Sequence, residues 1–103
     1  MNIYVLKSWS EQGKGVSGRK TINSNEFFVF PGIYPGAKFH MRSVSFPISI
    51  GFFDKNGRLI KSYDMESETG TAEAPSNTSF AVEASVGAFN KIKSFSNKYS
   101  KDF

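Results

Sequence analysis

The clearest pattern in the chain is a run of eight residues, 46–53, in which every second position carries a large apolar side chain. A period of two places alternate side chains on the same face of a β-strand. The positions between them include Ser49 and Gly51, which favour either solvent or a close neighbour on the opposite face. We therefore expect a strand whose core-facing positions are Phe46, Ile48, Ile50 and Phe52.

A hairpin is predicted directly after this strand. Asn56-Gly57 is a residue pair that tolerates positive φ at both central positions of a tight turn. The return strand is expected over residues 58–65, with Leu59 and Ile60 anchoring it in the core.

Shorter strands are predicted wherever β-forming residues cluster between turn residues. They fall at residues 3–6, 27–30, 39–41 and 80–84. In the last of these the alternation turns Phe80 and Val82 inward and Glu83 away from them. A single helical turn is expected within residues 85–92, where apolar side chains recur at helical spacing at Val86, Phe89 and Ile92.

Three stretches are expected to lack regular structure. Residues 8–24 are polar and contain Gly13, Gly15 and Gly18, which have the G-x-G-x-x-G spacing of a dinucleotide site. Such a site also needs a helix after the glycines, and the sequence that follows Gly18 does not favour one. This stretch is predicted to be a mobile loop, and the acidic stretch 66–78 an exposed loop. The Lys-rich tail, residues 93–103, is expected to fray.

Strands joined by short turns predict a mostly-β single domain over residues 1–92, barrel-like or sandwich-like, with at most one or two short helices. Eleven Phe, four Tyr and one Trp supply the core of this small chain. The absence of Cys excludes disulfides, thiolate zinc sites and a thiol nucleophile. No run is long and apolar enough for a signal peptide or membrane span, which predicts a cytoplasmic protein without membrane contact.

The formal net charge of +4 could support weak nucleic-acid contact, although a solvated surface with a charged tail is the favoured explanation. Aromatic residues interleaved with basic ones, as at Lys7, Trp9, Phe39 and Arg42, are the pattern on which single-stranded bases stack. Most of the Phe residues are better explained as core.

Several blocks, in order, resemble the signature of domain-of-unknown-function family 192. The blocks are Phe28-Val29-Phe30-Pro31, Phe39 to Val44, Phe46 to Asp54, and Gly57-Arg58, with weaker similarity upstream at Gly15 to Arg19 and downstream at Ala81-Val82-Glu83, Gly87 and Phe89. The resemblance covers about residues 3–92. It implies a small, mostly-β, barrel-like fold with short helices, and it implies no reaction.

The chain departs from that signature at the third strand and at its end. His40 stands where the family usually has Trp, and Arg42-Ser43 stands where it has Lys-Asn. The last apolar stretch of the family is replaced by Lys, Ser and Asn. These departures indicate a shortened, divergent member, and Phe-, Asn- and Lys-rich small proteins of this kind occur in AT-rich genomes, including those of phages.

The candidate ligand-binding residues are Phe39, His40, Arg42, Asp54 and Glu83. His40 alternates away from Phe39 and Met41, so it is either a proton shuttle or ligand contact in a pocket, or a substituted surface or packing residue. Arg42 offers a fork for a carboxylate or phosphate, or else pairs with Asp54 or Glu83. Asp54 begins a turn, where Asp commonly caps with its side chain.

A lone His without Cys is a poor basis for a zinc site, so no metal or cofactor is predicted. The favoured function is a non-catalytic accessory domain that binds a small anion or a protein. The first alternative is a small acid–base hydrolase using His40 with Asp54 or Glu83. The second is a virion- or nucleic-acid-associated interaction protein.

Overall fold

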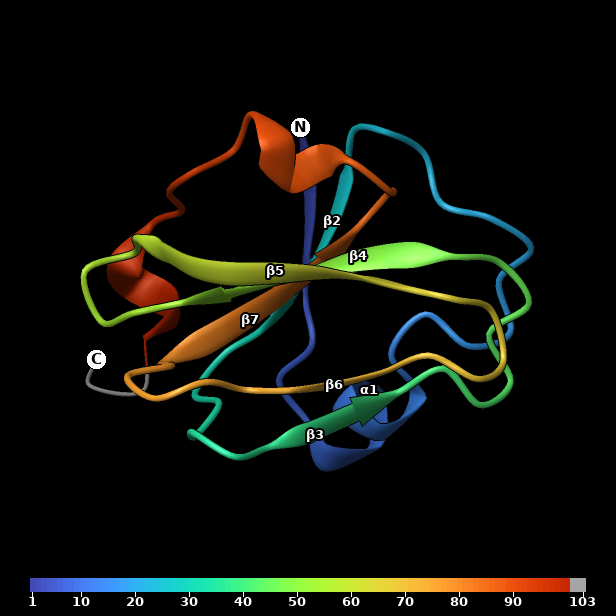
Figure 1. Cartoon of the computed structure of the whole chain (residues 1–103), viewed down its shortest axis with the longest axis horizontal. Helices are drawn as coiled ribbons and strands as arrows, with labels where there is room; N and C mark the ends of the chain where they lie inside the picture. The colour runs from blue at the N-terminus through green and yellow to red at the C-terminus, as the bar shows by residue number, and fades with distance from the viewer. Residues whose placement is uncertain (101–103) are drawn as a thin grey trace.

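A computed structural model describes residues 1–100, apart from the side chain of Trp9. Within this range seven strands form two sheets (Figure 1). The elements in chain order are β1 (Asn2–Val5), α1 (Trp9–Lys14), β2 (Glu26–Phe30), β3 (Lys38–His40), β4 (Ile48–Phe53), β5 (Leu59–Met65), β6 (Thr71–Glu73), β7 (Phe80–Ala84) and the 3-10 turns η1 (Ala88–Asn90) and η2 (Asn97–Tyr99).

The larger sheet has the strand order β1-β2-β7-β4-β5 and does not close on itself. β1 runs parallel to β2, and the remaining neighbours are antiparallel. β3 and β6 form a separate antiparallel pair. The predicted mostly-β class is therefore confirmed, with open sheets in place of a barrel.

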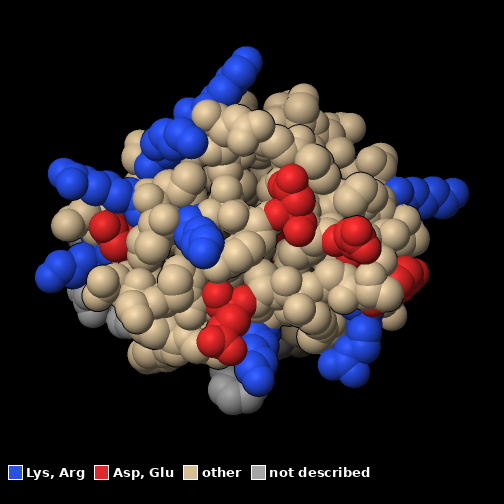
Figure 2. All heavy atoms as spheres, in the orientation of Figure 1, with Lys and Arg blue, Asp and Glu red and all other residues tan. Residues whose placement is uncertain are grey.

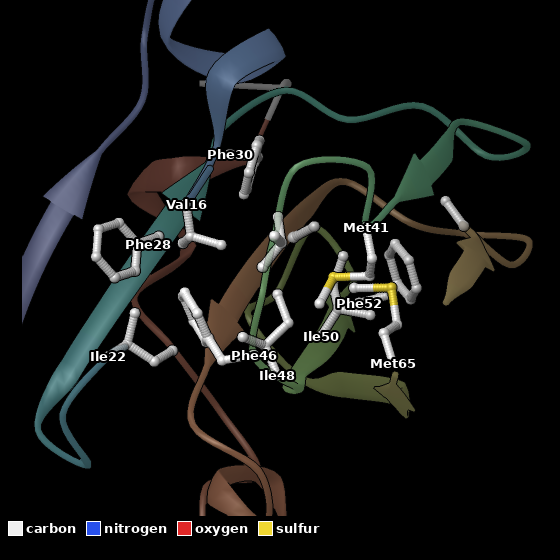
Figure 3. Close-up of a cluster of buried hydrophobic side chains, with 13 residues drawn as sticks. Val16, Ile22, Phe28, Phe30, Met41, Phe46, Ile48, Ile50, Phe52 and Met65 are labelled. Carbon is white, nitrogen blue, oxygen red and sulfur yellow. The ribbon is translucent and has the colours of Figure 1, made fainter. Parts of the chain in front are cut away.

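Both faces of the larger sheet are covered over its three central strands, so β2, β4 and β7 are buried at every position, whereas the edge strands β1 and β5 are largely exposed. One face carries the first core cluster, in which Phe28, Phe30, Ile48, Ile50 and Phe52 point into the same layer (Figure 3). The opposite face carries the second cluster, with Phe27, Val29, Phe53, Phe80, Val82 and Phe89. The predicted core face of β4 is thus confirmed, since Phe46, Ile48, Ile50 and Phe52 all lie in the first cluster.

Ser49 and Gly51 face a close neighbour and not solvent. A Cβ on Gly51 would stand 3.0 Å from ring atoms of Phe53 and Phe89, so the missing side chain lets η1 pack directly on β4. The Ser49 hydroxyl donates to the Asp64 carboxylate on β5 and accepts the backbone N–H of Gly87 at 3.1 Å. Both residues therefore join β4 to the layer above it.

The β4–β5 hairpin forms at the predicted turn. Gly57 has a φ of +81°, as the Asn-Gly pair predicts. The Asp54 carboxylate accepts the backbone N–H groups of Asn56 at 2.9 Å and Arg58 at 3.0 Å, which closes the turn. Leu59 packs against the second cluster. The prediction for Ile60 was wrong: it is exposed, because it is the extra residue of a β-bulge between Leu59, which pairs with Phe53, and Lys61, which pairs with Phe52.

The stretch predicted to be a mobile loop contains a six-residue helix, α1, so that prediction was wrong for residues 9–14. Ser8 is its N-cap: the Ser8 hydroxyl accepts the Glu11 backbone N–H at 3.0 Å, and the Glu11 carboxylate accepts the Ser8 backbone N–H at 2.9 Å. This reciprocal capping box compensates for the poor helix formers inside α1. Gly15 ends the helix at a φ of +52°.

The acidic stretch 66–78 was also predicted incompletely, because residues 71–73 form β6. Thr71, Ala72 and Glu73 pair with His40, Phe39 and Lys38 of β3. Ala74 and Thr78, which follow β6, are buried. The stretch is therefore a strand and an anchored connection, and not a wholly exposed loop.

The segment after β7 returns across the second face of the sheet. Phe89 is buried within η1, whereas Val86, expected to share its face, is exposed. Phe95 packs against Phe27 and Phe53 with ring centroids 5.6 and 5.4 Å apart, and Tyr99 is buried in the second cluster. The C-terminal stretch, expected to fray, is packed as far as Ser100; residues 101–103 lie outside the described range.

Candidate ligand cavity

A cavity of about 270 Å³ opens on the side of the first core cluster, between the end of α1, the strand β3 and the larger sheet. In Figure 1 β3 and α1 lie together at the lower edge of the molecule. The lining comes from residues far apart in sequence: Gln12, Gly13, Lys14, Gly15, Val16, Phe30, Ile33, Ala37, Lys38, Phe39, His40, Arg42, Val44 and Glu83. This volume is close to the lower end of the range for small-molecule sites.

Glu83 is the only carboxylate that the described residues contribute to this lining. It lies on β7 between Phe28 of β2 and Ile50 of β4, and alternation turns it into the layer of the first core cluster. The residue is 5% exposed, and its Oε1 has no hydrogen-bond partner among the described residues. Buried polar atoms are nearly always paired, so this oxygen is available for a partner from outside the chain.

The backbone of Gly15 leaves room beside that oxygen. A Cβ at Gly15 would stand 3.5 Å from Glu83 Oε1 and 3.6 Å from Phe30 Cζ. The positive φ of Gly15 is also a conformation that glycine adopts most easily. A larger residue at this position would therefore fill part of the space beside the carboxyl group.

Burial raises the pKa of the Glu83 carboxyl from its ordinary value to about 8, because removal from water disfavours the charged form. At neutral pH the group is then mainly a carboxylic acid. In that form one oxygen can donate a hydrogen bond and the other can accept one. The inner end of the cavity is thus polar but close to uncharged.

The outer part of the lining is basic. Lys14 ends α1, Lys38 and His40 lie on β3, and Arg42 follows β3. All four side chains are exposed, and none of them forms an ion pair with another described residue. The Arg42 backbone N–H donates to His40 Nδ1 at 3.3 Å, which leaves Nε2 as the donor of the neutral ring. Positive charge therefore surrounds the entrance.

Apolar side chains line the cavity as well. Phe30 and Phe39 meet edge to face with ring centroids 5.3 Å apart, and Ile33 and Val44 complete the wall. The cavity accordingly has three zones: a basic entrance, an apolar wall and a buried carboxyl group.

Four of the five residues that sequence analysis singled out line this one cavity: Phe39, His40, Arg42 and Glu83. Asp54 does not line it and instead closes the β4–β5 turn. The ion pair considered between Arg42 and an acid does not form among the described residues. Sequence analysis missed Lys14, Gly15 and Lys38, because only the fold brings α1 and β3 together.

Other site classes find less support in the described residues. No three His, Cys, Asp or Glu side chains within residues 1–100 are arranged to hold a metal ion. No helix in that range is long and apolar enough to cross a membrane. Figure 2 shows Lys and Arg interspersed with Asp and Glu on the face that it presents, so the described part of this face has no continuous basic patch of the kind that nucleic acids favour.

Comparisons with known proteins agree with the fold. The family model of DUF192, described as "Uncharacterized ACR", matches residues 1–94, which confirms the resemblance noted in the sequence. A protein of unknown function from Novosphingobium aromaticivorans has a similar structure, with a TM-score of 0.74 and 20% identity, over 89% of this chain and 70% of that one. No curated protein matches the sequence significantly.

A second solved structure of the same fold comes from Sinorhizobium meliloti 1021 and is assigned provisionally as a transcription regulator. Its TM-score is 0.76 at 11% identity, over 86% of this chain and 71% of that one. At such identities the two likenesses establish the fold and not a shared activity.

Proposed function

The chain belongs to domain-of-unknown-function family 192, and we propose that it is a binding module for a small organic anion, held in the cavity beside Glu83. The observation that carries this proposal is the arrangement of the lining, where four basic side chains, none ion-paired with another described residue, surround the mouth of an apolar recess. Such a recess, with a few convergent polar groups, is the usual form of a small-molecule site.

The basic entrance favours a carboxylate or phosphate as the anionic group. Arg42 presents a planar fork that matches either group with two parallel hydrogen bonds, and Lys14 and Lys38 add positive charge beside it. The apolar wall, with Phe30 and Phe39 at its centre, favours a ligand that also has a hydrocarbon part. Inorganic anions use only the entrance and should bind more weakly than organic ones.

The proposal is tested by NMR titration of the isotope-labelled protein with hexanoate, benzoate and inorganic phosphate. We expect the organic acids to shift the amide signals of residues 13–16, 38–42 and 83 and to leave the β4–β5 turn unchanged. Replacing Arg42 with Gln should weaken binding by about tenfold, since a charge-assisted hydrogen bond is lost.

The matched control is Arg58→Gln, which removes an equally exposed arginine from the β4–β5 turn. It should bind as the unchanged protein does. Shifts that map elsewhere, or an equal loss of affinity in both variants, would show that only the overall charge matters and would overturn the proposal.

Acid–base catalysis is the second candidate, because His40 and Glu83 line the same cavity. A carboxyl group whose pKa is raised toward neutrality is suited to act as a general acid. Among the described residues the lining contains no Ser, Thr or Tyr that could serve as a nucleophile, so a hydrolase here would have to activate water directly. Turnover of small ester or amide substrates that disappears in Glu83→Gln would support it; equal rates in the two proteins would exclude it.

A further inference from the structure

The inner and outer ends of the cavity have opposite chemical character. The inner end holds one carboxyl group, with Oε1 unpartnered among the described residues and less than one-tenth of the residue exposed. The outer end is lined by cationic or donor side chains, from Lys14, Lys38, His40 and Arg42. A ligand that carries an anionic group alone would satisfy the entrance and leave Glu83 Oε1 without a partner.

On the basis of the function proposed above, we propose that the ligand is an amino acid whose ammonium and carboxylate groups are separated by an apolar chain. The ammonium group pairs with the Glu83 carboxylate at the inner end, and the ligand carboxylate faces the cations of the entrance. The hydrocarbon chain between them lies along the wall formed by Phe30, Ile33, Phe39 and Val44.

The burial of Glu83 is what favours an ammonium group over a neutral donor. An unpartnered buried carboxylate is strongly disfavoured, whereas a buried pair of opposite charges recovers much of the lost solvation. An ammonium group has three donors and no acceptor, so it can donate to the oxygens of the Glu83 carboxylate. Part of their accepting capacity stays unused when Glu83 is a neutral carboxylic acid without a partner. The free protein thus holds the neutral acid, and the ligand-bound protein holds an ion pair.

This exchange has a definite proton balance. On binding near neutral pH, the Glu83 O–H bond breaks and its proton goes to solvent, while the ligand ammonium keeps all three of its protons. The other titratable groups that face Glu83 across the cavity are Lys14 from α1, Lys38 and His40 from β3, and Arg42 after β3. The neighbouring strands β2 and β4 present Phe28 and Ile50 beside it, which do not titrate. Glu83 is the only acid among these groups, and a ligand carboxylate would make the basic groups hold their protons more tightly, so Glu83 is the source of the released proton.

The test compares matched pairs of probes by isothermal titration calorimetry. The amino acids are 4-aminobutyrate, 6-aminohexanoate and 8-aminooctanoate, and their partners are butyrate, hexanoate and octanoate, which lack only the amine. Each pair shares its carboxylate, so effects of pH on the basic entrance cancel in the ratio of the two affinities. For the chain length that fits, the affinity of the amino acid divided by that of its deaminated partner should rise by about tenfold per pH unit between about pH 6 and pH 8. Over this range each pH unit raises the charged fraction of Glu83 by about tenfold.

Repeating the titration in two buffers of different ionisation enthalpy counts the released protons. We expect close to one proton per bound amino acid near pH 7 and none for the deaminated partner. In Glu83→Gln the affinity ratio should no longer depend on pH. The amide NMR spectrum and the urea unfolding curve of the variant, recorded beside those of the wild-type protein, show whether it is folded.

The outcomes separate this inference from the function on which it rests. If the deaminated acids bind in the cavity and the amine brings no pH-dependent gain at any chain length, the ammonium pairing is overturned and the anion-binding function stands. If the gain persists in Glu83→Gln, the pairing with Glu83 is overturned. If no acid of either kind binds, both proposals are overturned.

Discussion

Glu83 shows at the scale of one residue how the fold changes the chemistry of an ordinary side chain. On an isolated strand this carboxyl would face solvent, because alternation turns it away from Phe80 and Val82. In the folded chain the layer formed by α1 and β3 covers it, and Gly15 lies against it. Desolvation then raises its pKa to about 8.

The raised pKa makes the stability of the protein depend on pH. Between the ordinary pKa near 4.5 and about 8, the folded chain holds a proton on Glu83 that the unfolded chain has released. The free energy of unfolding should therefore fall by about 1.4 kcal/mol per pH unit as the pH rises through this window. Glu83→Gln should remove this slope and be the more stable protein near pH 8. Urea unfolding at a series of pH values checks this, and identical slopes in both proteins would contradict it.

At the scale of elements, the short helix α1 contributes Gln12, Gly13 and Lys14 to the cavity lining, although its composition is poor for a helix. The capping box between Ser8 and Glu11 compensates for that composition. Ser8→Ala should lower the free energy of unfolding by about 1 kcal/mol and speed amide exchange at residues 11–15. Ser10→Ala, an exposed change inside the same helix, is the control and should leave both unchanged or slightly improved. Equal losses in the two variants would show that the cap contributes nothing.

The β4–β5 hairpin depends on Gly57 in a different way. Its φ is +81°, and a Cβ would stand 2.0 Å from the Phe95 carbonyl oxygen. Gly57→Ala should therefore destabilise the protein by roughly 2–4 kcal/mol, from backbone strain and the displaced C-terminal segment.

Gly13 provides the matched control for that change. It lies in α1 without a positive φ, and a Cβ added there would meet no described heavy atom within 4 Å apart from its chain neighbours and the backbone of its own helix. Gly13→Ala should stabilise the protein by up to about 1 kcal/mol, as alanine does in a helix. The same urea unfolding experiment compares both variants. A Gly57→Ala protein as stable as the parent would contradict the packing of residues 95–97 on the turn.

At the scale of the whole molecule, the features that sequence alone predicted are those fixed by local pattern. Alternation located β4 and its core face, and Asn56-Gly57 located the hairpin, because both depend on residues a few positions apart. The strand β6 was missed because Thr71, Ala72 and Glu73 have no apolar alternation and are held by pairing with β3. That pairing is a tertiary contact, and no local pattern encodes it.

The candidate site divides in the same way. Phe39, His40 and Arg42 could be singled out because they stand together in one short segment, and Glu83 because it breaks an apolar strand. Their meeting in one cavity, and the addition of Lys14, depend on how α1 and β3 pack on the sheet. The helix α1 could have been predicted from the sequence, since Ser8 and Glu11 form the S-x-x-E pattern of a capping box.

The claim on which the whole account depends is that Glu83 is a neutral, buried acid in a cavity whose exposed lining side chains are basic. The most direct test is to follow the carboxyl ¹³C signal of Glu83 by NMR as the pH is raised, with Glu83→Gln identifying the signal. We predict a titration midpoint near 8, well above the ordinary value for a glutamate side chain. A midpoint near the ordinary value of 4.5 would show that the carboxyl is charged and hydrated at neutral pH, and it would contradict the account.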